Sequence, residues 1–118
     1  MIECISAVTI TTRNMARAVA FYQALGFTLK YGGADAGFTS FHAGHSALNL
    51  RIAGDEPGWT PLARIIFWVG DVDDQHALAI SAGLEPDFSP RDATWGERYF
   101  HITDPDGHGL SFAKLLAP

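Results

Sequence analysis

The sequence predicts an α+β fold made of two tandem β-α-β-β-β modules. The strand pattern at 8–10 recurs at 65–67, an offset of 57 residues, and each copy leads into a helical stretch. A glycine follows each stretch, at Gly26 and Gly83. Neither module can bury a helix and both faces of its strands alone. We therefore expect one curved, mixed eight-stranded sheet, with the helices outside and a cleft on its inner face.

The first module begins with a strand at 6–11, where apolar and small polar residues alternate. Asn14 offers a side-chain oxygen to cap a helix over Met15–Leu25, whose apolar residues recur at three- and four-residue steps. Further strands are expected at 27–31, 38–42 and 47–51, with Ala43 and Gly44 in the turn between the last two.

The second module follows a linker at 54–62 that is rich in glycine and proline. A strand at 64–69 leads to Asp71, which caps a helix ending at Gly83. Strands are expected at 85–88, 98–103 and 109–114, and the Asp-Pro-Asp-Gly run at 104–107 predicts a turn. The chain is thus one domain over 1–118, with module 1 at about 1–53 and module 2 at about 63–118.

Composition narrows the function classes. The chain has 118 residues, of which 47% are hydrophobic, so it is typical of a globular domain. Cys4 is the only cysteine, which excludes an internal disulfide and cysteine-pair zinc motifs. We expect a cytoplasmic protein without a signal peptide or membrane span. The net charge of −5 argues against nucleic acid; it suits a cationic ligand or serves solubility.

Strand alternation predicts which side chains face the cleft. If Val8 and Ile10 pack under the first helix, Thr9 points inward, and Leu48 and Leu50 leave Asn49 inward by the same argument. The second module follows the same alternation. The residues expected on the inner face are Ala7, Thr9, Asn49, Arg64, Ile66, Trp68, Tyr99, His101 and Ser111.

The chain resembles a known superfamily over essentially its whole length. The paired modules, the runs at 7–10, 21–22 and 25–27, and the closing run at 104–108 are similar to the vicinal oxygen chelate superfamily. It includes glyoxalase I, extradiol dioxygenases, fosfomycin-resistance enzymes and bleomycin-resistance proteins. The runs at 68–73 and 95–100 look most like bleomycin-resistance proteins.

This resemblance implies where a metal would bind. The superfamily's enzymes hold a divalent metal with His and Glu at four positions, which correspond here to Ala7, Asn49, Arg64 and Ser111. Alanine has no donor atom, and arginine carries a permanent positive charge. Asparagine and serine are weak neutral donors on their own. We therefore expect no metal and no cofactor.

Two polar residues of the cleft each have two interpretations. His101, beside Tyr99, is either a general acid or base, or a ring that contacts ligand without chemistry. Arg64 either binds a polar group of the ligand or pairs with an internal carboxylate, for which Glu97 and Asp92 are candidates.

Tryptophans carry the aromatic signal. Trp68 should point into the cleft, while Trp59 and Trp95 lie in loops and indicate a lid, a dimer contact, a ligand wall or core packing. Six aromatic residues near one cleft favour a stacking site for a flat ligand: Phe38, Trp59, Trp68, Trp95, Tyr99 and His101.

We expect a homodimeric small-molecule binding protein that sequesters a flat aromatic ligand, neutral or cationic, without metal, as antibiotic-resistance proteins of the bleomycin type do. The alternative is a lyase, isomerase or dioxygenase with a rearranged metal site or a metal-free pair of His101 and Tyr99. A third interpretation is an interaction domain with a vestigial cleft. The expected ligand contacts are Thr9, Phe38, Asn49, Arg64, Trp68, Trp95, Tyr99, His101 and Ser111.

Overall fold

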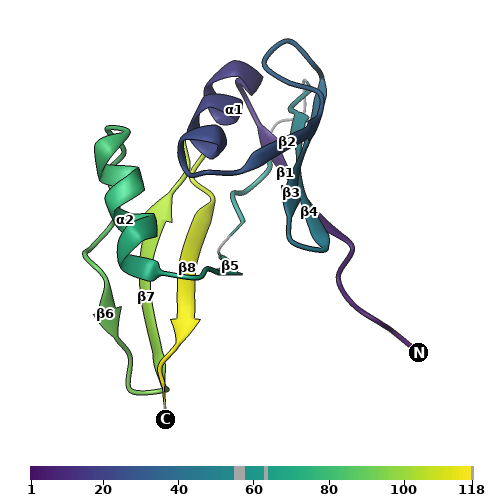
Figure 1. Ribbon diagram of the computed structural model, residues 1–118. Coiled ribbons are helices and arrows are strands. Elements are labelled where there is room, and N and C mark those ends of the chain that lie inside the picture. Colours follow the sequence, from purple (N-terminus) through teal and green to yellow (C-terminus); the bar gives the residue numbers. More distant parts are fainter. Residues whose placement is uncertain (55–57, 63, 118) are drawn as a thin grey trace. The chain divides into compact units, whose positions relative to one another are not determined.

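The computed structural model describes residues 1–54, 58–62 and 64–117, and part of the predicted linker lies outside these ranges. The chain divides into two compact units, Met1–Pro61 and Leu62–Pro118. In the described residues, each unit contains one helix and four strands, as Figure 1 shows. The α+β class and the two-module organisation are confirmed. Neither described helix has the length and apolar character needed to cross a membrane.

The two units repeat one order of elements. Unit 1 contains β1 (Ala7–Thr12), α1 (Met15–Ala24), β2 (Thr28–Tyr31), β3 (Phe38–Ala43) and β4 (Ser46–Ile52). Unit 2 contains β5 (Ile65–Trp68), α2 (Val72–Ser81), β6 (Arg91–Asp92), β7 (Glu97–Thr103) and β8 (Gly109–Leu115).

Each unit forms its own four-stranded mixed sheet. The strand orders are β1-β4-β3-β2 and β5-β8-β7-β6, so the expected eight strands are divided between two sheets. In both, the first strand runs parallel to the last one and the hairpin strands are antiparallel. Thr9 lies opposite Asn49 in the first sheet, and Ile66 lies opposite Ser111 in the second. The strand pattern that repeats in the sequence therefore also pairs in the same way in both units, with the first strand beside the last.

Local signals set the ends of both helices as expected. The side chains of Asn14 and Asp71 each accept the backbone N–H three residues later, at 3.0 Å. Gly26 and Gly83 follow the helices with φ of 94° and 80°, a conformation that costs glycine little. Both predicted caps and both predicted helix ends are confirmed.

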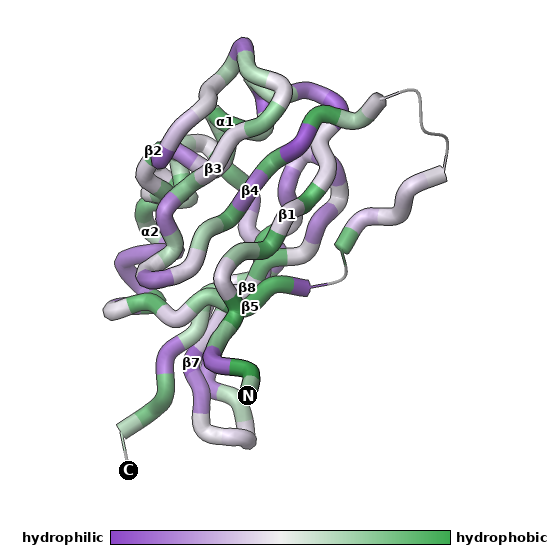
Figure 2. The backbone as a smooth tube through the Cα atoms, turned by 90° about the vertical axis from the view of Figure 1, so that its right-hand side faces the viewer, coloured by the Kyte–Doolittle hydropathy of each residue, from purple (hydrophilic) through white to green (hydrophobic). Residues whose placement is uncertain are grey.

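The helix in each unit covers one face of its sheet. In unit 1, Tyr22 of α1 packs against Phe41, and Leu48 and Leu50 are buried on the same side. Figure 2 shows hydrophobic and hydrophilic residues alternating along β4, which leaves Asn49 on the other face. In unit 2, His76 of α2 meets Phe100 edge-on at 5.1 Å between ring centroids.

One predicted strand is wrong. Residues 85–88 are not a strand, and the edge strand is instead the short β6, where Arg91 lies opposite Tyr99. Pro86 lacks the N–H that a ladder needs, and Pro90 ends the irregular segment. The backbone N–H of Asp87 nonetheless donates to the carbonyl of His101 at 2.8 Å. The segment therefore stays beside β7 without joining the sheet.

The turn between β7 and β8 is confirmed and is tightly bonded. The Asp104 side chain is 4% exposed, and its Oδ1 accepts the backbone N–H groups of Asp106 and His108, both at 2.9 Å. Gly107 has φ of 91°, and the Asp104 N–H donates to the carbonyl of His108. This turn fixes the register of the two strands that carry most of the second sheet.

We predict that Asp104→Ala lowers the free energy of unfolding by about 2 kcal/mol, because two backbone donors lose a charged acceptor in a buried turn. Asp104→Asn keeps an oxygen at that position and should cost less. Urea denaturation of both variants measures the difference. Asp35→Ala, in an exposed loop, is the control and should change little. Equal losses in the two Asp104 variants would contradict the role of Oδ1.

Candidate functional site

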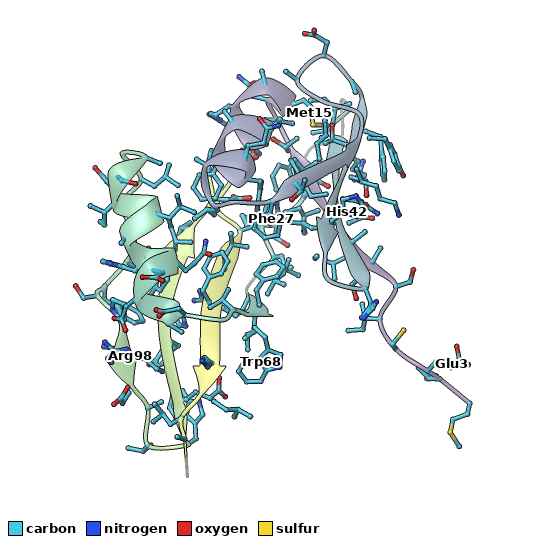
Figure 3. All side chains as sticks on the ribbon, in the orientation of Figure 1. Glu3, Met15, Phe27, His42, Trp68 and Arg98 are labelled. Carbon is cyan, nitrogen blue, oxygen red and sulfur yellow. The ribbon has the colours of Figure 1, made fainter. Side chains whose placement is uncertain are left out.

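The face of the second sheet opposite α2 carries the side chains of interest. Trp68, Ala113 and Tyr99 lie side by side across β5, β8 and β7, and Ile66, Ser111 and His101 form the next row. In Figure 3, Trp68 lies on the side of the sheet away from α2, whereas Arg98 lies on the side of α2. We call the side with Trp68 the open face, and its residues are Ile66, Trp68, Tyr99, His101, Ser111 and Ala113.

Large apolar side chains are exposed here. Ile66, Trp68 and the nearby Trp95 are 62%, 63% and 65% exposed. Between them, the central strand β8 contributes short side chains, and Ser111 is only 3% exposed. Exposed apolar residues gathered on one surface are typical of a binding site, since water solvates them poorly.

Aromatic rings form a connected cluster around Tyr99. Its ring centroid lies 5.5 Å from that of Trp95, 5.5 Å from that of Phe88 and 5.2 Å from that of His101. Phe88 and His101 are themselves 5.0 Å apart. Tilted and edge-on contacts of this kind hold rings in fixed orientations. The structure therefore brings together three predicted site residues, Trp95, Tyr99 and His101.

Two members of this cluster were not predicted from the sequence. Arg91 places its guanidinium carbon 3.8 Å from the ring centroid of Phe88 and 5.4 Å from that of Tyr99. Its Nε also donates to the Tyr99 hydroxyl at 3.2 Å. The sequence predicts Phe88 in a strand, and an arginine after Pro90 gives no distinct sequence signal. The contact of Arg91 and Phe88 with Tyr99 becomes evident only from the pairing of β6 with β7, in which Arg91 lies opposite Tyr99.

Arg64, just before β5, is exposed, and its positive charge acts on His101. One of its terminal nitrogens donates to the carbonyl of Leu110 at 3.0 Å. Of the two expected carboxylate partners, Asp92 pairs instead with Arg98 at 3.0 Å. Within the described ranges, Arg64 has no ion pair with Glu97 or any other acid. Its charge is therefore available to a ligand.

His101 is held mainly in its neutral form. Burial lowers the pKa of its imidazole below the ordinary value, and the positive charge of Arg64 lowers it further. Asp87 opposes this effect, and Arg91 adds to the lowering. At neutral pH the ring can therefore donate or accept a hydrogen bond without carrying charge.

The remaining predicted contacts lie in the first unit. Asn49 donates from Nδ2 to Thr9 Oγ1 at 3.2 Å, and its buried Oδ1 has no hydrogen-bond partner among the described residues. Phe38 stacks on Tyr31 with ring centroids 6.1 Å apart. These side chains occupy the sheet face opposite α1.

The residues at the four family metal positions do not fit a divalent metal. Arg64 is a cation that donates to Leu110, and Ala7 has no donor atom. Asn49 and Ser111 offer only neutral oxygens, and Ser111 is buried. The described residues also contain no group of three or more His, Cys, Asp or Glu that could hold a metal.

The sequence matches a known family, and the fold matches solved structures. The family model of the Glyoxalase/Bleomycin resistance protein/Dioxygenase superfamily matches residues 5–112. No curated protein matches the sequence.

Several solved structures share the fold. TioX from Micromonospora sp. ML1 is 22% identical, with a TM-score of 0.78 over 97% of this chain and 100% of that one. A lactoylglutathione lyase from Agrobacterium tumefaciens is 17% identical, with a TM-score of 0.76 over 93% and 92%. A bleomycin resistance determinant encoded on the transposon Tn5 is 21% identical, with a TM-score of 0.76 over 96% and 98%.

We predict that the His101 imidazole titrates below the ordinary histidine value of about 6.5 in an NMR titration. Arg64→Met should raise its pKa, because a nearby positive charge is removed, and Lys114→Met, on the opposite face, should leave it unchanged. An Arg64→Met variant with an unaltered titration would contradict the coupling.

The same pKa shift predicts a direction for stability. The folded-state pKa of His101 lies below its unfolded value. The contribution of His101 to the free energy of unfolding is therefore present above the unfolded pKa and is lost as the pH falls through the folded pKa. Denaturation at a series of pH values measures this loss. In His101→Gln, that part of the pH dependence should disappear; an identical pH profile would contradict the assignment.

Proposed function

Because this chain belongs to the Glyoxalase/Bleomycin resistance protein/Dioxygenase superfamily, we propose that it binds a flat aromatic small molecule on the open face of its second sheet and does not change it chemically. The observation that carries this proposal is the exposure of Trp68 and Trp95 beside the fixed ring of Tyr99. Sequestration, not turnover, would be its activity.

Stacking supplies the binding energy in this proposal. An aromatic ring stacked on a ligand contributes about 1–3 kcal/mol by alanine substitution. Trp68 and Trp95 offer two such rings, and the cluster around Tyr99 limits how much conformational freedom Trp95 loses on binding. A flat ligand would also cover the exposed side chain of Ile66.

Electrostatics support a site without metal. A guanidinium about 4 Å from a divalent cation would oppose it by roughly 8 kcal/mol at an effective dielectric near 20. Arg64 stands at one of the family's metal positions, and it has no carboxylate partner in the described part of the chain to offset this repulsion. The proposal therefore assigns ligand contact, not chelation, to Arg64.

One observation favours a second candidate function, a metal-free lyase or isomerase. His101 is mainly neutral at pH 7 and lies beside Tyr99, so it could accept a proton from a ligand. A catalytic base is usually oriented by a third group. Asp87, whose charge acts on His101, instead accepts a hydrogen bond from the hydroxyl of Thr103, and the ring contacts of His101 are to Phe88 and Tyr99. Binding is therefore the better supported function.

The proposal includes a cytoplasmic homodimer that could protect a cell from an aromatic antibiotic. Besides stacking on the ligand, Trp95 is the candidate dimer contact, because its ring is largely exposed. The other loop tryptophan, Trp59, is half-buried and has the guanidinium of Arg13 4.7 Å from its ring centroid. Light scattering measures the oligomeric state of the wild-type chain and of Trp95→Ala. A wild-type chain that is a monomer at all concentrations would contradict the proposed dimer.

We predict that Trp68→Ala and Trp95→Ala each weaken binding of 2-naphthamide, a flat neutral probe, by about 1–3 kcal/mol. Calorimetry measures the affinity, and bleomycin is tested beside it as an antibiotic probe. Leu78→Ala, which removes an exposed apolar side chain from α2, is the control and should bind normally. Unchanged affinity in both tryptophan variants would remove the stacking claim.

Metal removal should leave this binding unchanged. Protein dialysed against EDTA and protein supplied with zinc, nickel or manganese should bind 2-naphthamide equally, because the open face supplies no chelating set. Elemental analysis of protein purified without chelators completes the test. A stoichiometric metal whose removal abolishes binding would contradict the proposal.

A further inference from the structure

We propose that the open face selects aromatic ligands that carry a carboxylate, and that the guanidinium of Arg64 binds this carboxylate. The inference rests on the proposed binding function and deepens it by naming the class of ligand. It follows from the position of Arg64, from the local charges and from the order of side chains along β5.

Arg64 is built to receive a planar anion. Its side chain is exposed, and the bond from one terminal nitrogen to the carbonyl of Leu110 fixes its orientation at 3.0 Å. The other N–H groups of the guanidinium remain available in a fork that matches both oxygens of a carboxylate. No acid in the described ranges pairs with it, so a ligand need not displace an internal partner.

Local charges favour an anion although the chain as a whole is acidic. The charges that act on His101, at the centre of the face, are Arg64, Asp87 and Arg91. Both oxygens of Asp87 lie 3.3 Å from the Thr103 hydroxyl, which donates to this carboxylate. Strand alternation places the acidic Glu97 on the same face as Tyr99, but it lies at the other end of β7 and is not among the groups that shift the pKa of His101. The net charge of −5, which suits a cationic ligand, does not describe this face.

The order of side chains along β5 fits a ring joined to a carboxylate. Arg64, Ile66 and Trp68 are all exposed and alternate with side chains that are partly buried. Arg64 and Trp68 are about 13 Å apart along the strand at the usual rise per residue, and the long arginine side chain shortens that gap. A bicyclic aromatic acid could lie over Ile66, with its ring against Trp68 and its carboxylate at Arg64.

Three probes that share one ring system test the charge preference: 2-naphthoate, 2-naphthamide and 2-naphthylmethylammonium. By calorimetry, the carboxylate should bind about tenfold tighter than the amide, because a hydrogen bond to a charged group adds that much, and the ammonium should bind most weakly. Added salt should reduce the carboxylate's advantage over the neutral amide, because salt screens the charge of Arg64.

Variants assign this preference to Arg64. Arg64→Met should bring 2-naphthoate to within about twofold of the amide, which corresponds to loss of the charged bond. Arg64→Lys keeps the charge without the fork and should retain part of the preference. Lys114→Met removes a positive charge whose ammonium bonds Gly70 beside α2, and it should retain the full preference. Circular dichroism checks that each variant is folded.

The outcomes separate this inference from the proposed function. If amide and carboxylate bind equally and Trp68→Ala weakens both, the binding function stands and the carboxylate preference is wrong. The same holds if Arg64→Met keeps the tenfold preference. If no naphthalene probe binds and Trp68→Ala turns a dimer into a monomer, the face is an interface between copies, and both proposals are wrong.

Discussion

Parallel pairing of the first and last strands of each unit is the constraint on which the structure depends. Parallel neighbours need a long crossover, and here α1 or α2 starts that connection while a hairpin completes it. The pairing makes β8 central in the second sheet, between β5 and β7. It also sets Ser111 and Ala113 between the larger residues of those strands. The open face exists because this central strand carries short side chains there.

Local signals made much of this fold predictable, whereas contacts distant in sequence were not. Asn14, Asp71 and the turn at 104–107 act within a few residues, so their roles can be read from the chain directly. Strand alternation likewise predicted the exposed side of β5. The contact between Arg91 and Phe88 depends on an irregular, proline-bounded segment, for which no periodic pattern exists. The same applies to Arg98, whose pairing with Asp73 and Asp92 joins α2, β6 and β7.

Charge must be considered at the scale of the site. An excess of acidic residues describes the whole surface, but salt screens such charges within about 10 Å at ordinary ionic strength. What a ligand meets is the local set, here Arg64, Arg91 and Asp87 around a largely neutral His101. Composition therefore predicts solubility better than it predicts the ligand.

Arg64 also links the proposed binding function to the chemistry of the superfamily. A chelated metal attracts an oxygen anion through a cation that the protein must first hold with anionic side chains. A guanidinium is a cation fixed covalently to the chain, so it needs no carboxylates to hold it. The residues at the other metal-ligand positions of the family, such as Ala7 and Asn49, then do not have to be anionic, because there is no metal cation for them to hold. An arginine at this position can keep the attraction for a ligand's oxygens while losing the Lewis acidity that drives metal catalysis.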